Sequence, residues 1–135
     1  MSGFISVREE VLDRMVEEAR RTPRQECCGL LAGQGGVITA AFPAVNVLAS
    51  ATAFEIAPEE LFRLFREMRA AGLDFLGIYH SHPEGDNSPS SRDVERAYYP
   101  DVAYFIVSPQ RSAPQPIRAF SISNGRVSEL AIEPA

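Results

Sequence analysis

Residues 79–93 read YHSHPEGDNSPSSRD and contain both histidines of the chain, His80 and His82. An apolar run, FLGIY at residues 75–79, precedes the histidines and predicts a buried strand, and the Pro, Gly, Ser and Asn residues that follow predict a loop. Side chains alternate along a strand, so the two imidazoles project from one face, about 7 Å apart. They could therefore reach one small metal ion, or they are two ordinary polar residues at the rim of a sheet.

A second motif, Ser90-x-x-Asp93, predicts the first turn of a helix after the loop. Ser90 as N-cap and Asp93 at the third helical position form a capping box, which is the simplest interpretation of this spacing. The same helix start brings the Asp93 carboxylate back to the end of the strand. Two histidines and one aspartate make three ligands, and a zinc site with three protein ligands keeps a fourth position for water. Capping and metal binding by Asp93 are compatible.

With an upstream glutamate, these residues resemble the JAMM (MPN-plus) family of zinc metallopeptidases. The family motif is a glutamate, then His-Ser/Thr-His-Pro, then Ser-x-x-Asp, and here it corresponds to Glu26, residues 80–83 and residues 90–93. The segment PRQECCGLL at residues 23–31 is similar to the family segment that places the glutamate before a strand. Looser matches are Asn46, residues 54–56 and the helix expected after Pro58.

The resemblance implies a mixed α/β (α+β) fold, a single JAB/MPN domain with a curved mixed sheet flanked by helices (cytidine-deaminase-like). It also implies one Zn²⁺ per chain, held by His80, His82 and Asp93. Glu26 would be the general base and acid, although a lone glutamate at a strand entrance is more often a solvated charge. Ser90 would donate a hydrogen bond to the oxyanion. Ser81, between the two histidines, is expected to face away and to be structural.

The family cleaves amide and isopeptide bonds after the C-terminal Gly-Gly tail of ubiquitin-like proteins. Only ten residues separate His82 from Asp93, so the chain looks like the small prokaryotic members, some of which release cysteine or another adduct from a sulfur-carrier protein. We therefore expect a metallopeptidase whose partner is a ubiquitin-like or sulfur-carrier protein. The alternative is a catalytically idle MPN-type scaffold. Arg92 and Arg111 are candidates to hold a substrate carboxylate, or they are plain surface residues.

Length, composition and net charge limit which other classes of function are possible. The 135 residues, 45% of them hydrophobic, fit one domain over residues 1–135. A net charge of −5 argues against a nucleic-acid partner, and the chain has no apolar run long enough for a membrane span. The N-terminus lacks the regions of a signal peptide, so we expect a cytoplasmic protein, in which the adjacent Cys27 and Cys28 form no disulfide. The sequence gives no oligomeric state.

Two further alternatives concern related folds. A zinc-dependent nucleobase deaminase also uses a glutamate and a bound water, but it needs His-x-Glu and Pro-Cys-x-x-Cys, and neither occurs in this chain. A relative with a task in DNA repair or phage-tail assembly stays open, although the acidic charge makes DNA a poor partner.

The remaining elements follow from periodicity and turn residues. Ser6 and Glu9 suggest a capping box for a first helix that ends before Pro23, and Pro58 starts a second helix whose aromatic residues are expected in the core up to Gly72. Residues 43–52, with Asn46, form a loop or an irregular strand near the site. A short third helix is expected from Ser91 to about Tyr98. Strands are expected at 4–7, 27–32, 37–42, 54–56, 101–108, 117–123 and 126–132, with hairpin turns at 34–36 and 124–125.

Overall fold

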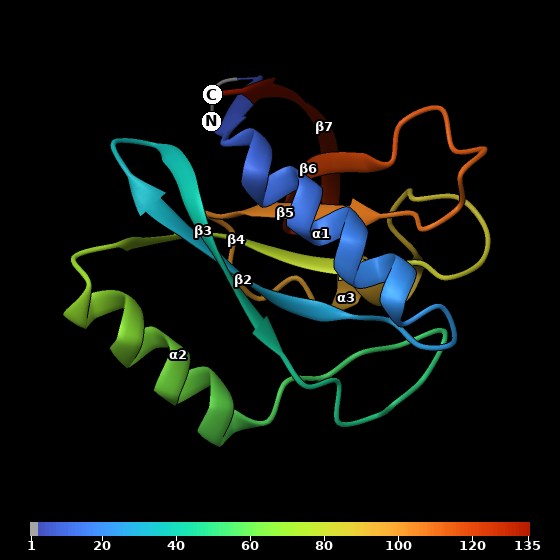
Figure 1. The fold of residues 1–135 in the computed structure, drawn as a ribbon, viewed down its shortest axis with the longest axis horizontal. Helices are drawn as coiled ribbons and strands as arrows, with labels where there is room; N and C mark the ends of the chain where they lie inside the picture. The colour runs from blue at the N-terminus through green and yellow to red at the C-terminus, as the bar shows by residue number, and fades with distance from the viewer. Residues whose placement is uncertain (1–2) are drawn as a thin grey trace.

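The computed structural model describes residues 3–135 (Figure 1). Residues 1 and 2, part of the N-terminal stretch expected to lack a signal peptide, lie outside the described residues. The elements follow in the order β1 (Phe4–Val7), α1 (Glu9–Arg21), β2 (Cys28–Gln34), β3 (Val37–Ala44), α2 (Pro58–Ala70), β4 (Asp74–Ser81), α3 (Ser91–Glu95), β5 (Ala103–Val107), β6 (Ile117–Ser123) and β7 (Arg126–Pro134).

The strands form one mixed sheet in the order β1-β3-β2-β4-β5-β6-β7. Strand β1 pairs in parallel with both β3 and β7, so the two ends of the sheet meet and the sheet closes into a barrel. Strands β4 and β5 are also parallel, and the other neighbours are antiparallel. The expected mixed α/β fold with a curved sheet is confirmed, and the curvature continues to full closure.

Each face of the sheet has its own apolar core. Helix α1 packs Val11, Met15 and Ala19 against residues from all seven strands, so it fills the side toward which the sheet curls (Figure 1). Helix α2 packs Leu64 and Met68 against the other face of β2, β4, β5 and β6. Along β4, Tyr79 belongs to the α1 core, whereas Ile78 and His80 face the α2 side. The alternation expected for this strand is therefore confirmed.

Several predicted boundaries are wrong for physical reasons. Ser6 lies inside β1, paired with Val37 and Glu133, and helix α1 has Arg8 as N-cap with no side-chain cap. Helix α3 ends at Glu95 instead of about Tyr98, because the N–H groups of Ala97 and Tyr98 bond to the carbonyls of Val94 and Arg96 instead of continuing the helical pattern. The hydroxyl of Tyr104 then binds both the N–H and the carbonyl of Tyr99.

Residues 54–56 form no strand, because their backbone is paired with a loop instead of a sheet edge. The Glu55 N–H donates to the Asn46 side chain, and the Glu55 carbonyl accepts from Val47. This segment therefore pairs with the loop around Asn46 and is not a strand of the barrel.

The aromatic residues of α2 are only partly in the core. Phe65 is half-buried against Phe75, but Phe62 is 64% exposed, so its expected burial is wrong. The buried line of the helix runs through Leu64 and Met68, and Phe62 points away from it beside Arg66. The amphipathic pattern predicted the helix correctly but not its rotation about its own axis.

The turns follow their residue types. Gly35 and Gly36 have φ of +61° and +77°, and Asn124 and Gly125 have φ of +52° and +76°, which is the backbone that tight hairpins require. Both predicted hairpins are confirmed. Among the described residues, 3–135, no helix combines the length and apolarity needed to cross a membrane.

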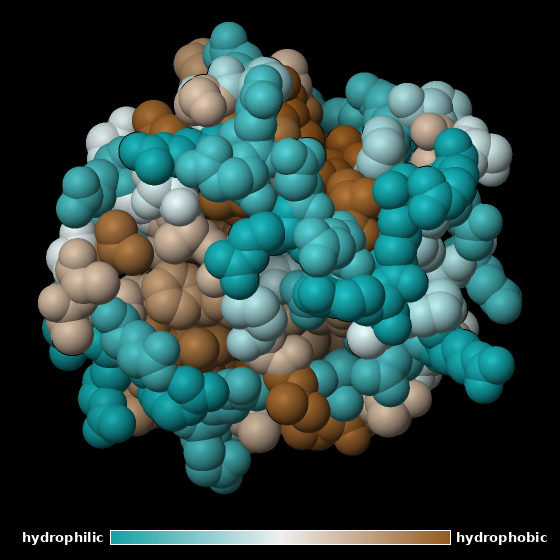
Figure 2. Space-filling view, viewed as in Figure 1, coloured by the Kyte–Doolittle hydropathy of each residue, from teal (hydrophilic) through white to brown (hydrophobic). Residues whose placement is uncertain are grey.

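The loop after β3 presents apolar side chains to solvent. Brown side chains gather at the lower edge of Figure 2, over this loop, where Val45, Val47 and Leu48 are exposed. Asn46, between them, is 5% exposed and points inward.

Candidate metal centre

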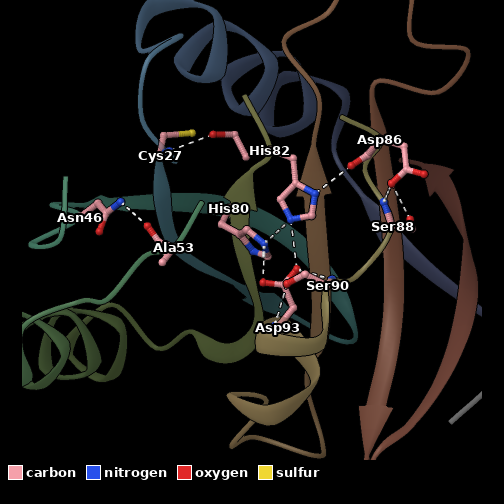
Figure 3. Close-up of polar contacts among 10 residues, drawn as sticks. Cys27, Asn46, Ala53, His80, His82, Asp86, Ser88, Ser90 and Asp93 are labelled. Carbon is pink, nitrogen blue, oxygen red and sulfur yellow. Dashed lines mark hydrogen bonds and ion pairs between the residues drawn. The ribbon is translucent and has the colours of Figure 1, made fainter. Parts of the chain in front are cut away.

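Three side chains converge where β4 ends and α3 begins (Figure 3). His80 is the penultimate residue of β4, His82 follows the strand directly, and Asp93 lies in the first turn of α3. The Nε2 atoms of the two histidines are 3.2 Å apart. Asp93 Oδ1 lies 3.1 Å from His80 Nε2, and Oδ2 lies 3.0 Å from His82 Nε2. The structure thus brings together all three ligands proposed from the sequence.

These distances fit a small tetrahedral cation. Zinc ligands at 2.0–2.1 Å in a tetrahedron are about 3.3 Å from one another, close to the three separations observed. The Nδ1 atom of His82 is 2.8 Å from the Asp86 carbonyl, which can only accept, so Nδ1 carries the proton. In neutral His82, Nε2 then turns a lone pair toward the Asp93 carboxylate. A cation between them removes this repulsion, so the donor set suits a metal such as zinc.

Electrostatics keep two of these groups in the form that binds metal. Burial lowers the pKa of His80, which is 3% exposed, and so favours its neutral imidazole despite the nearby Asp93. Burial alone would raise the pKa of Asp93, but hydrogen bonds from the His80 ring and from His82 in its protonated form hold it well below the ordinary range. Burial also opposes the charged form of His82, but contacts with Asp93 and the Asp86 carbonyl raise its pKa overall.

Ser90 and Asp93 form the predicted capping box. The Asp93 N–H donates to Ser90 Oγ at 3.0 Å, and the Ser90 N–H donates to Asp93 Oδ2 at 2.9 Å. The Ser90 hydroxyl therefore acts as an acceptor here, and its own proton is available for another group. One carboxylate serves both the cap and the candidate metal centre.

Glu26 lies just before β2 and is buried, with 3% of its surface exposed. Its Oε1 atom has no hydrogen-bond partner among the described residues. Burial raises the pKa of Glu26 to about 7; Asp93 acts in the same direction, and His82 and Arg92 oppose it. A carboxyl group that titrates near neutral pH can accept and return a proton, which is what a general base and acid requires.

Ser81 faces the opposite side from the histidines, as predicted. Its Oγ accepts the Cys27 N–H at 2.9 Å, and its own N–H donates to the Cys27 carbonyl at 3.0 Å. These bonds tie the residue after Glu26 to the residue between His80 and His82. Cys27 and Cys28 are both free and buried, and burial raises the pKa of the Cys27 thiol to about 11.

A cavity of about 150 Å³ opens beside two of the three candidate ligands. His80 and Asp93 form part of its wall, and Phe54 stacks on the His80 ring at 4.6 Å between centroids. Most of the remaining lining is apolar or aromatic: Leu30, Ile56, Leu61, Ile78, Tyr98, Tyr99, Tyr104, Ile106 and Ile122. Sequence reasoning missed this cavity, because its residues come from separate elements and share no spacing.

The two arginines proposed to hold a carboxylate have different positions. Arg92 lies in α3 and lines the cavity next to Asp93. Arg111 is exposed on the loop between β5 and β6 and does not line the cavity. The structure therefore brings Arg92 to the site and does not bring Arg111 to it.

Fold and site together define a JAB/MPN-type domain with a candidate metal centre at the strand end. The sequence matches the family described as prokaryotic homologs of the JAB domain over residues 8–123. The chain belongs to this family, which confirms the predicted JAMM/MPN relationship.

Relatives with assigned names cover most of the chain. It is 43% identical to a desampylase of Haloferax volcanii, over 81% of each chain. It is 33% identical to the CysO-cysteine peptidase of Mycobacterium tuberculosis, over 91% of this chain and 86% of that one. A solution structure of a Desulfitobacterium hafniense protein superimposes with a TM-score of 0.85 at 29% identity, covering 98% of this chain and 93% of that one.

Proposed function

We propose that this protein is a zinc metallopeptidase of the JAMM type that hydrolyses an amide or isopeptide bond between a ubiquitin-like or sulfur-carrier protein and its adduct. One observation carries the proposal: a His-His-Asp group with metal-binding separations lies close enough to the buried Glu26 carboxyl group for His82 and Asp93 to affect its pKa, and Glu26 Oε1 has no hydrogen-bond partner among residues 3–135. His80, His82 and Asp93 hold the metal, and Glu26 is the catalytic carboxyl group. We propose one Zn²⁺ per chain, in a single domain that spans residues 1–135.

The chemistry divides between the metal and the protein. Zinc, when bound, polarises the scissile carbonyl and lowers the pKa of water, so that a nucleophile exists at neutral pH. Glu26 would accept the proton of the attacking water and return it to the leaving amine; burial, which raises the pKa of its carboxyl group in the metal-free protein, makes it a stronger base for the first step. Ser90 donates its hydroxyl proton to the oxyanion, because the capping bond occupies only a lone pair of its oxygen.

The relatives support the class of substrate. The names of two of them, desampylase and CysO-cysteine peptidase, describe enzymes that act on conjugates of small proteins. For this chain we propose a carrier whose C-terminal Gly-Gly tail lies in the groove beside the metal. Arg92 would hold a carboxylate of the adduct, and its position in the lining of the cavity, next to Asp93, supports this role. A cytoplasmic location, in which Cys27 and Cys28 stay reduced, is part of the proposal.

The substrate claim is tested with two synthetic conjugates of one ubiquitin-like protein that ends in Gly-Gly. In the first conjugate the terminal glycine is linked to cysteine, and in the second to the ε-amino group of a lysine. A third conjugate, with the last glycine replaced by alanine, is the control. We expect cleavage of at least one Gly-Gly conjugate, loss of cleavage after treatment with a chelator, and recovery with Zn²⁺. Binding of zinc without cleavage of either conjugate would overturn the substrate class.

A further inference from the structure

The position of Glu26 depends on contacts outside the sheet. Strand β2 begins at Cys28, so Glu26 is not part of the ladder. Its N–H donates to the Ser50 carbonyl at 2.8 Å, and its carbonyl accepts from Asn46 Nδ2 at 3.0 Å. Since Oε1 has no partner among residues 3–135, the backbone contacts carry much of the placement of this side chain.

Asn46 uses its whole amide group on the surrounding backbone. Nδ2 donates to the carbonyls of Glu26 and Ala53, each at 3.0 Å. Oδ1 accepts the N–H groups of Leu48 at 3.1 Å and Glu55 at 3.2 Å. One side chain thus joins Glu26, two residues before β2, to the segment 53–55 (Figure 3 shows the bond to Ala53).

The loop around Asn46 reverses the usual distribution of polarity. Asn46 is 5% exposed, whereas its neighbours Val45 and Val47 are 65% and 49% exposed. Burial of apolar surface does not explain this choice, because the opposite orientation would bury two valines and leave the amide in water. The inward amide is explained by the four backbone groups that it pairs, which would otherwise lie unpaired near the site.

The segment that Asn46 fixes is also a wall of the cavity. Ala53, Phe54 and Glu55 line it, and the Phe54 ring stacks on His80. A substrate that occupied this cavity would therefore contact residues whose backbone Asn46 holds. The same side chain holds the carbonyl of Glu26.

We propose that Asn46 is a positioning residue, which sets the general base and the substrate-facing segment 53–55 relative to each other. This inference rests on the proposed function, in which Glu26 is the base. Asn46 acts through its neighbours and touches neither the metal ligands nor the substrate.

Kinetics of two variants test the inference. Asn46→Ala removes all four contacts. Asn46→Asp keeps an acceptor for Leu48 and Glu55 but turns an oxygen toward the carbonyls of Glu26 and Ala53. For both variants we expect kcat to fall about 100-fold, as small misplacements of reacting groups do, with a several-fold rise in KM and zinc still at one ion per chain. Wild-type kcat in either variant would overturn the inference.

A stability control separates positioning from general loosening. Met68 lies on the buried face of α2 and does not line the cavity. Met68→Ala therefore weakens the fold without touching the site, and we expect its kcat and KM to stay within about twofold of wild type at temperatures well below unfolding. An equal fall in kcat for Met68→Ala and the Asn46 variants would show that Asn46 acts only through stability.

Amide hydrogen exchange tests the coupling without a substrate. The Glu26 amide donates to the Ser50 carbonyl in this loop, and the Glu55 amide donates to Asn46 itself. Loss of the Asn46 side chain should therefore release both amides, and we expect their hydrogen exchange to accelerate at least tenfold. The amide of Ile106, in β5, should not change. If the wild-type protein cleaves no conjugate but this selective release occurs, the proposed function fails and the structural coupling stands. Unchanged exchange at Glu26 in Asn46→Ala would contradict the coupling itself.

Discussion

Asp93 and Ser90 exchange two hydrogen bonds at the start of α3, at 2.9 and 3.0 Å, while both carboxylate oxygens of Asp93 remain in contact with the histidines. The cap holds the carboxylate in the orientation that the candidate metal centre needs. A helix of five residues has little stability of its own, so this cap also fixes where the helix begins. The two interpretations of the Ser-x-x-Asp motif are parts of one arrangement.

Ser90→Ala should therefore have two separate effects. Loss of the cap should lower the free energy of unfolding by about 1 kcal/mol. Loss of the proposed oxyanion donor should lower kcat by about 100-fold or more. Ser91→Ala, at the exposed neighbouring position, is the matched control and should change neither quantity appreciably. Thermal denaturation and steady-state kinetics on the same samples would measure both effects, and a normal kcat in Ser90→Ala would remove Ser90 from the mechanism.

The burial of Glu26 predicts a pH-dependent cost to stability in the metal-free protein. Its pKa rises from 4.5 to about 7 on folding, so the unfolded chain loses this proton first as the pH increases. The free energy of unfolding should thus fall between pH 4.5 and 7 and stay lowered above pH 7, by about 3 kcal/mol at most. Glu26→Gln removes this effect.

Denaturant unfolding of chelator-treated samples at pH 5 and pH 8 measures this difference. The free energy of unfolding of Glu26→Gln minus that of wild type should be larger at pH 8 than at pH 5, by about 2 kcal/mol. Glu84→Gln, in the exposed part of the loop after His82, is the control. Equal relative stability at the two pH values would mean that the Glu26 carboxyl group is not perturbed.

Catalysis should also depend on the protonation of Glu26. A general base must be deprotonated, so kcat/KM should fall tenfold per pH unit on the acidic side, and the zinc charge should place this limb at or below the pKa of about 7 that Glu26 has in the metal-free protein. The measurement is a pH profile of conjugate cleavage at constant zinc and ionic strength. An acidic limb that stays unchanged in Glu26→Gln would contradict the assignment of Glu26.

Metal binding should depend on the three converging side chains. We expect one zinc per chain in wild type, a higher melting temperature with zinc than with chelator, and loss of both effects in His82→Ala and Asp93→Asn. Asp86→Asn is the matched control, because this exposed carboxylate lies in the same loop and contacts Ser88 instead of the histidines. Elemental analysis and thermal shift would measure the outcome. Full zinc content in Asp93→Asn would exclude Asp93 as a ligand.

Local patterns predicted the parts of this fold that depend on neighbouring residues. The hairpin at Asn124-Gly125 could be predicted because both residue types tolerate the positive φ angles that they adopt, and the start of α3 because Ser90 caps it. The alternation along β4 placed His80 and Ser81 on opposite faces. These features could be predicted because each depends on a few adjacent residues.

Features that depend on residues far apart in the sequence could not be predicted from local patterns. Strand β1 closes the barrel by pairing with β7, at the other end of the sequence, and no local pattern contains that information. The rotation of α2 that exposes Phe62, and the Tyr104 hydroxyl that binds the backbone of Tyr99 after α3, are likewise set by packing. At the site, the motif supplied the candidate ligands and Glu26, but the hydrogen bonds of Asn46 and the cavity appear only once the elements are assembled.

The most direct test of the central claim compares wild type with Glu26→Gln at equal zinc content, using a ubiquitin-like protein joined through its terminal Gly-Gly to cysteine or lysine. Mass spectrometry would locate the cleaved bond. We predict cleavage directly after the second glycine by the wild-type protein, and a rate at least 100-fold lower for Glu26→Gln although zinc remains bound. Equal cleavage by the two zinc-loaded proteins, or no cleavage by either, would contradict the assignment of this site as a metallopeptidase centre with Glu26 as its base.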